Sequence, residues 1–188
     1  MAMRAYRHFL LADDETEGVR LLFWQRLPWL LIGLVGGIAM TWVVARYESV
    51  ITGEIRLAFF LPIIVYLSDA VGTQTEVIVV RGLARHRPHL AAYLLKESAL
   101  GLILGSLFGG LLGLFAFYWY QDFALALTIG LALFIDIAVA TVLALVVPLV
   151  IYKGNRDPAL GAGPITTIIQ DFISVLVYFT VASAILLF

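Results

Sequence analysis

Long apolar blocks alternate with short polar segments along this chain of 188 residues. Each block is long enough for an α-helix, which rises about 1.5 Å per residue, to cross a hydrocarbon core about 30 Å thick. The pattern therefore predicts an all-α integral membrane protein with five transmembrane helices per protomer. The predicted spans cover approximately residues 27–44, 57–80, 93–118, 123–151 and 161–188.

A polar lead-in precedes the first span and contains a run of acids. The acids at positions 13, 14, 15 and 17 are followed by Val19, Leu22 and Phe23, which share one face at helical spacing. Residues 1–25 are therefore predicted to form an amphipathic segment at the cytoplasmic membrane interface. A plug or an acidic vestibule below a pore is the alternative interpretation. Residues 26–188 then form the predicted five-helix transmembrane pore domain.

Polar side chains form a stripe on two of the five predicted spans. In the fifth span they recur at intervals of four, three and four residues, at Thr167, Asp171, Ser174 and Tyr178. In the second span a similar set recurs at intervals of four, three, four and three residues, at Pro62, Tyr66, Asp69, Thr73 and Glu76. These intervals place each set on one face of an α-helix.

Four acids lie well within the predicted spans: Asp69, Glu76, Asp136 and Asp171. An acid at the centre of a membrane helix costs about 2.5–3.5 kcal/mol by helix-insertion measurements, so it normally faces a partner or a water-filled path. No lysine or arginine lies deep enough in the spans to pair with these acids. Oxygen ligands without thiolates favour a hard divalent cation, Mg²⁺ before Ca²⁺ or Mn²⁺. Asp136 stands alone on its helix, where a protonated carboxyl bonded to another helix is an equal alternative.

The composition excludes several classes of protein. Hydrophobic residues make up 62% of the chain and charged residues 13%, and the mean hydropathy is +1.01, which is typical of a polytopic membrane protein. A net charge of −1 without a basic run argues against a nucleic-acid partner. The absence of cysteine excludes disulfides, thiolate metal sites and cysteine nucleophiles.

Lysine and arginine are distributed unevenly between the predicted loops. With the amino terminus inside, ten of them lie on the cytoplasmic side and two, Arg46 and Arg56, lie outside. Cytoplasmic loops of membrane proteins carry such an excess. We therefore expect a multi-pass protein of the inner (plasma) membrane with a cytoplasmic amino terminus and a carboxyl terminus outside.

Glycine and proline predict details of packing and of helix ends. In the third span a glycine recurs at every fourth residue, at Gly101, Gly105, Gly109 and Gly113. Such a ridge lets another helix approach closely, and packing is its predicted role. Pro164 suits the first turn of the fifth helix, where its missing N–H costs nothing. Asp157-Pro158 is typical of a turn or a helix start.

Motifs in the second span and around the fourth and fifth spans occur together in one family. They are Pro62-Ile63-Ile64, Gly72-Thr73-Gln74, Val79-Val80-Arg81-Gly82-Leu83-Ala84, Pro148-Leu149-Val150, Asp157-Pro158-Ala159, Gly163-Pro164, Thr166-Thr167, Asp171 and Tyr178-Phe179, with Arg26-Leu27-Pro28-Trp29-Leu30 before the first span. In these segments, and over nearly the whole chain from Arg20 onward, the sequence resembles the MgtE family of magnesium channels.

The resemblance implies a five-helix protomer and a homodimer whose pore is lined by the second and fifth helices. It also implies that Asp171 occupies the position of the family's pore carboxylate, which holds hydrated Mg²⁺. Family members carry Gly-Gly-Asn before the Gly-Thr-Gln, whereas this chain carries Ser68-Asp69-Ala70. Typical bacterial members also carry a large soluble sensor before the pore. This sequence is therefore expected to be a membrane domain without that sensor, either a naturally minimal member or an excised domain.

The predicted function is transport of a divalent cation, Mg²⁺ foremost, without enzymatic activity and without a cofactor. The predicted metal-binding residues are Asp171, Asp69 and Glu76. The predicted pore-lining residues are Gly72, Thr73, Asp136, Thr167 and Ser174. The expected partners are divalent cations, the lipid bilayer and a second copy of the chain.

Two other functions stay open at this stage. A carrier coupled to protons or Na⁺ would use Asp69, Glu76 or Asp136 as a residue that alternates between a protonated and an ion-bound state. An intramembrane aspartyl protease would use Asp136 and Asp171 as a pair that shares a proton and activates water. Such proteases carry Gly-x-Gly-Asp, which this chain lacks before Asp171.

Overall fold

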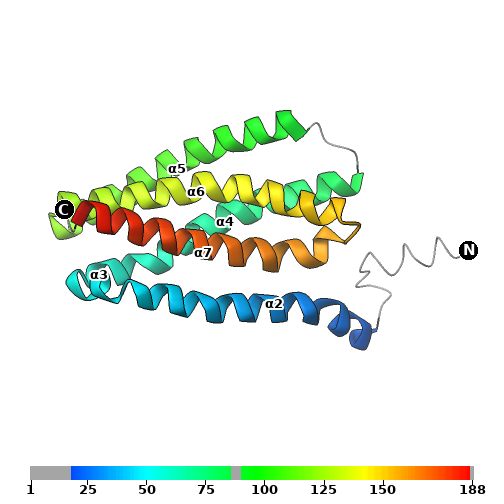
Figure 1. Ribbon diagram of the computed structural model, residues 1–188. Helices are drawn as coiled ribbons and strands as arrows, with labels where there is room; N and C mark the ends of the chain where they lie inside the picture. The colour runs from blue at the N-terminus through cyan, green and yellow to red at the C-terminus, as the bar shows by residue number, and fades with distance from the viewer. Residues whose placement is uncertain (1–17, 86–89, 187–188) are drawn as a thin grey trace, which may run out of the picture.

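The computed structural model describes residues 18–85 and 90–186, and in these residues the regular structure is entirely helical. The helices are α2 (Val19–Arg46), α3 (Glu48–Gly53), α4 (Arg56–Arg85), α5 (Leu90–Tyr120), α6 (Phe123–Lys153) and α7 (Pro158–Leu186) (Figure 1). All of them except the short α3 are long and apolar enough to cross a membrane. The prediction of an all-α integral membrane protein with five spans is confirmed.

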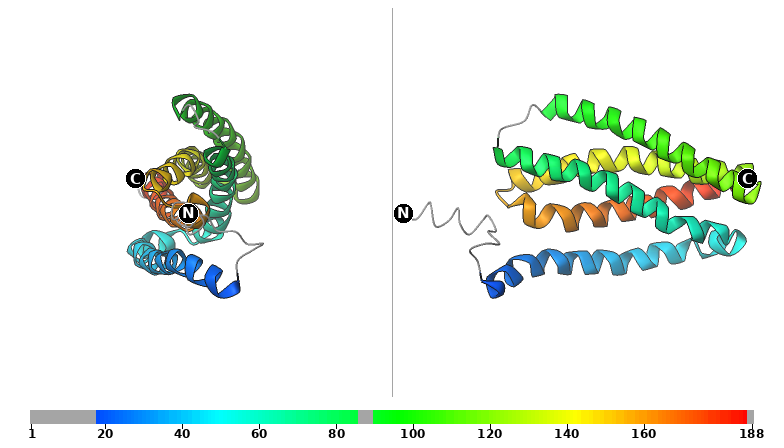
Figure 2. Two further views of the ribbon diagram at one scale, coloured as in Figure 1. Left: turned by 90° about the vertical axis from the view of Figure 1, so that its right-hand side faces the viewer. Right: turned by 180° about the vertical axis from the view of Figure 1, so that it is seen from behind.

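The long helices run side by side, and α6 lies at the centre of the bundle. It packs against α4, α5 and α7, and α4 also packs against α7. Helix α2 lies at one edge, against α7, and α5 lies at the opposite edge, against α6 (Figure 2). This arrangement makes α6 the most buried helix and leaves α2 without a buried residue.

Helix α2 begins within the predicted amino-terminal segment. Residues 1–17, including the acidic run, lie outside the described residues. Val19–Gln25, predicted to belong to a separate interfacial segment, form the first turns of α2 and continue without a break into the first span. Their apolar side chains, such as Phe23 and Trp24, extend the apolar block toward the amino terminus.

The start of α7 also differs from the prediction that Pro164 occupies the first turn. The helix begins at Pro158, and Asp157 Oδ1 accepts a hydrogen bond from Ala159 N at 2.9 Å. Aspartate before a helix and proline at its first position are both favoured, because the first N–H groups have no partner inside the helix. Asp157-Pro158 is therefore the helix start, and Pro164 lies inside the helix.

The glycine ridge of α5 packs on α6, as predicted. A Cβ at Gly109 would lie 2.5 Å from the backbone oxygen of Gly130, and one at Gly105 would lie 2.8 Å from that of Phe134. At the ends of the ridge, Gly113 faces the backbone oxygen of Ala126, and Gly101 faces the side chain of Thr141. The backbones of α5 and α6 are therefore in contact at Gly105 and Gly109, and a residue larger than glycine would not fit there.

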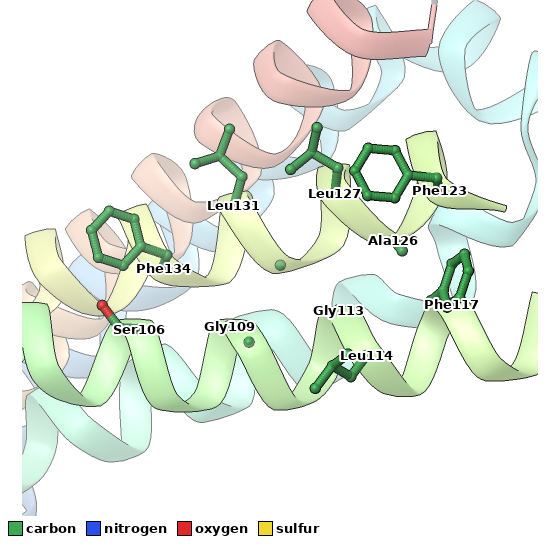
Figure 3. Close-up of a pocket in the computed structure, with 12 residues that line it drawn as sticks. Ser106, Gly109, Gly113, Leu114, Phe117, Phe123, Ala126, Leu127, Leu131 and Phe134 are labelled. Atoms are coloured by element: carbon green, nitrogen blue, oxygen red, sulfur yellow. The ribbon is translucent and has the colours of Figure 1, made fainter.

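An apolar cleft of about 600 Å³ lies beside this contact, between α5 and α6 (Figure 3). Phe117 and Phe123 stand at one end of it and Phe134 at the other, while Gly109 and Gly113 lie along α5. Its lining contains no acid or base. A path for a charged ion therefore requires a different part of the molecule.

Charged side chains at the end of the bundle where α7 ends are paired with one another. Arg56 binds the Glu54 carboxylate through Nε and Nη2, and its Nη2 lies 2.8 Å from Asp122 Oδ2. This Arg56 pairing holds the pKa of Glu54 below its ordinary value. The pKa of Asp122 is also lowered, first by the Leu125 N–H that it caps and then by Arg56. The cluster links the start of α4 to the loop between α5 and α6.

Candidate cation site

The polar stripes of α4 and α7 meet because these two helices pack against each other. Thr167 Oγ1 on α7 donates a hydrogen bond to Asp69 Oδ1 on α4 at 3.3 Å. Nearer the start of α7, a Cβ at Gly163 would lie 3.7 Å from Glu76 Oε1. The two helices thus bring acids and hydroxyls from distant parts of the sequence to one side of the protomer.

Three of the predicted acids lie near one another on this side. Asp69 interacts electrostatically with Asp171 on α7 and with Glu76 on its own helix. All three side chains are half-buried. We define the acidic face as Asp69, Glu76, Thr167 and Asp171. Helix α7 contains no lysine or arginine, and α4 has none in its membrane-spanning middle. Like charges repel one another on a partly buried surface, so a cation bound there would offset the repulsion.

The spacing of these acids limits how they can hold an ion. Within the described ranges, no group of three or more histidine, aspartate or glutamate side chains is close enough to hold a metal ion directly. Mg²⁺ usually keeps several of its waters when a protein binds it. Asp69 and Asp171 could therefore hold such an ion through its bound water, with the Thr167 hydroxyl as a further oxygen.

The stripe on α7 is not uniformly accessible. Thr167 and Asp171 are half-buried, whereas Ser174 is 2% exposed and Tyr178 is fully buried. Tyr178 donates its hydroxyl hydrogen to Leu57 O on α4 at 2.8 Å. The ring of Phe179 next to it stacks on Tyr47, with ring centroids 4.9 Å apart. The neighbouring helices therefore close the stripe toward the end of α7 and leave the Asp171 region open.

Two predicted pore-lining residues on α4 lie in different surroundings. Gly72 is buried against the side chain of Gln170, whereas Thr73 is exposed. Gln170 Nε2 donates to Ser68 O on α4 at 3.5 Å. The sequence interpretation did not single out Gln170, although an amide next to Asp171 inside an apolar span is a signal that could have found it. Gln170 fixes the distance between α4 and α7 directly behind the acidic face.

Asp136 is separated from the other predicted acids. It is 1% exposed on α6, and neither of its carboxyl oxygens makes a hydrogen bond. The polar side chain that interacts with Asp136 is Ser174. Asp171, by contrast, interacts electrostatically with Asp69. The structure therefore places Asp136 and Ser174 in the interior of the protomer and not on the acidic face.

Comparison with known proteins gives a consistent family assignment. Residues 61–181, which include α6 and most of α4 and α7, match the family MgtE, described as "Divalent cation transporter". The chain is 32% identical over 162 residues to the magnesium transporter MgtE of Enterococcus faecalis. It is 26% identical over 164 residues to that of Bacillus subtilis and 27% identical over 168 residues to that of Thermus thermophilus.

These alignments cover most of this chain but a smaller part of each relative. They include 85% of this chain for the E. faecalis protein, 86% for the B. subtilis protein and 88% for the T. thermophilus protein. The matched part is 36–37% of each relative, so the chain spans about a third of the length of the proteins that it matches. The family match over the membrane helices and the 32% identity together establish that this chain belongs to the MgtE family of divalent cation transporters.

Proposed function

We propose that this chain forms a path for a divalent cation, Mg²⁺ foremost, across the membrane along the acidic face. The observation that carries the proposal is the meeting of Asp69 and Asp171, from α4 and α7, on a half-buried surface. Helix α7 has no lysine or arginine, and α4 has none between Arg56 and Arg81. The relatives named as magnesium transporters support Mg²⁺ as the ion.

The chemistry of the acidic face supports a hydrated ion. Its atoms are carboxylate and hydroxyl oxygens, which suit Mg²⁺, Ca²⁺ and Mn²⁺. Removing water from Mg²⁺ is costly, and dispersed oxygens that accept hydrogen bonds from ion-bound water avoid that cost. In this proposal Asp171 and Asp69 attract the ion, Thr167 contacts its water, and Glu76 adds negative potential near the cytoplasmic end.

A second copy of the chain completes the path in this proposal. Tyr66 is 68% exposed and Thr73 is exposed on the side of α4 that carries the polar stripe. Acids that face lipid are costly, so a partner that covers this side would stabilise the protein. We propose a homodimer in the inner membrane, with the amino terminus in the cytoplasm and the carboxyl terminus outside, in keeping with the excess of basic residues on one side.

Flux measurements on purified protein in liposomes test the proposed function. Vesicles that contain the protein and an Mg²⁺-sensitive dye should take up Mg²⁺ added outside faster than vesicles that lack the protein. With dyes sensitive to Mn²⁺ and Ca²⁺, the same assay gives the uptake rates of these ions, so the three ions can be ranked by rate. Equal rates with and without protein for all three ions would contradict the proposal.

Replacing Asp69 by Asn should lower Mg²⁺ flux only moderately, by less than about tenfold, because Asp171 keeps its charge. The ratio of Mg²⁺ to Mn²⁺ flux should rise. Carboxylates bind Mn²⁺ directly more easily than Mg²⁺, which holds its water tightly, so one fewer carboxylate weakens Mn²⁺ more. Initial rates for both ions measure this. Asp122→Asn, the same change at a paired outer acid, is the matched control, and an unchanged ratio in Asp69→Asn would assign Asp69 a structural role.

A further inference from the structure

Four polar side chains lie buried together where α4, α6 and α7 meet. They are at most 3% exposed and comprise Ser68, Asp136, Gln170 and Ser174. Gln170 donates a hydrogen bond to the backbone oxygen of Ser68. One turn further along α7, the Ser174 hydroxyl interacts with the carboxyl group of Asp136. Within the described part of the chain, the Ser68 hydroxyl and both oxygens of Asp136 meet no hydrogen-bond partner at bonding distance and angle. We call these four residues the interior cluster.

An ionised Asp136 would be very unfavourable in this position. A buried charge without a partner costs several kcal/mol, and among the described residues no lysine or arginine interacts with Asp136 to offset that cost. Helix α6 contains no lysine or arginine before Lys153 at its last position. The charged side chain in the middle of α7 is the acid Asp171, and those in the middle of α4 are the acids Asp69 and Glu76, so neither stretch offers a positive partner to a charged Asp136.

On α5, the charged side chains are Lys96 and Glu97, near the start of the helix. Glu97 accepts a hydrogen bond from Thr75 Oγ1 at 2.8 Å, and Lys96 beside it is exposed. Among the described residues, Ser174 is the side chain that acts on Asp136, and no charged group does so. A carboxylic acid, by contrast, carries a hydroxyl that can donate to a neighbouring hydroxyl oxygen. A bound proton would remove the buried charge of Asp136 and supply a donor toward the Ser174 hydroxyl.

We propose that Asp136 is a proton-binding site in the protomer interior, and that its proton controls the packing of α4 and α7 behind the acidic face. The interior cluster and the acidic face contain residues that are adjacent in the sequence, because Ser68 precedes Asp69 and Gln170 precedes Asp171. A movement of the cluster therefore also moves these two acids. When the carboxyl group releases its proton to water, a negative charge remains in the contact between the three helices. The helices must then separate or admit water, which displaces the two cation-attracting acids.

Infrared spectroscopy of the purified protein tests the proton directly. At neutral pH the wild type should show a C=O stretching band of a protonated carboxyl group that shifts in D₂O. Asp136→Asn should lack that band, and Asp136→Leu serves equally if the Asn variant does not fold. Thr128→Val, at a buried hydroxyl on α6 that bonds within its own helix at 2.8 Å, is the matched control and should retain the band.

Flux measurements test the coupling to the acidic face. Wild-type flux should change with pH on the alkaline side, whereas flux in Asp136→Asn should not follow that change. Equal spectra for wild type and Asp136→Asn would overturn the proton site, and so would a band that NaCl removes at constant pH, which would assign the site to Na⁺. Equal pH profiles of flux would overturn the coupling. The infrared result does not depend on flux, so it stands or falls separately from the proposed cation path.

Discussion

Replacing Asp171 by Asn is expected to reduce the initial rate of Mg²⁺ flux by at least about tenfold. The substitution keeps the shape of the side chain and removes the negative charge that lies nearest Asp69 across the α4–α7 contact. The remaining α7 oxygen of the acidic face, the Thr167 hydroxyl, is neutral and is engaged with Asp69.

Elementary electrostatics sets the size of this effect. A divalent ion about 5 Å from a carboxylate gains about 1.7 kcal/mol in water and about 7 kcal/mol at an effective dielectric constant of about 20. Since about 1.4 kcal/mol corresponds to a factor of ten, even the smaller value exceeds a tenfold loss. Asp171→Glu, which keeps the charge on a longer side chain, should retain more flux than Asp171→Asn.

The control for this experiment is again Asp122→Asn, which makes the same chemical change outside the acidic face. Asn also caps helices well, so α6 should keep its start. Liposome flux of the three proteins at equal reconstitution measures the effect. Full Mg²⁺ flux in Asp171→Asn would refute the assignment of the path to α4 and α7.

Replacing Gly109 by Ala is expected to destabilise the protein by about 1–3 kcal/mol, the usual cost of overpacking a tight contact. The added methyl group would lie 2.5 Å from the backbone oxygen of Gly130, and backbone cannot move aside as a flexible side chain can. The α5–α6 contact must therefore open. Because α5 packs on the bundle through α6, the whole helix would loosen.

The next residue offers a matched control. A Cβ at Gly110 would meet nothing within 4 Å. Gly110→Ala should therefore be neutral or stabilise α5 by up to about 1 kcal/mol, because alanine is the better helix former. Unfolding in detergent, followed by the loss of helical signal, compares the two variants with the wild type. Equal stability of Gly109→Ala and Gly110→Ala would show that the ridge does not set the helix contact.

The membrane helices and the faces that they use can be predicted from local sequence patterns. Apolar length predicted the five spans, since a helix must satisfy its own backbone while crossing lipid. The four-residue interval of Gly101 to Gly113 predicted a contact surface, which α6 occupies. The motifs around Gly72-Thr73-Gln74 and Asp171 indicated the family that the comparisons confirm. These features are local in the chain, so periodicity and composition reveal them.

Which polar residues are accessible depends on how the helices pack, and the sequence pattern does not reveal it. Thr167, Asp171, Ser174 and Tyr178 share one face of α7, yet the first two are half-buried and the last two are enclosed. Helical period assigns a residue to a face, but burial depends on how far the neighbouring helices extend over that face. The contact between Tyr178 and Leu57 spans 121 residues of sequence. The unpaired interior position of Asp136 likewise results from three helices meeting, which no local pattern encodes.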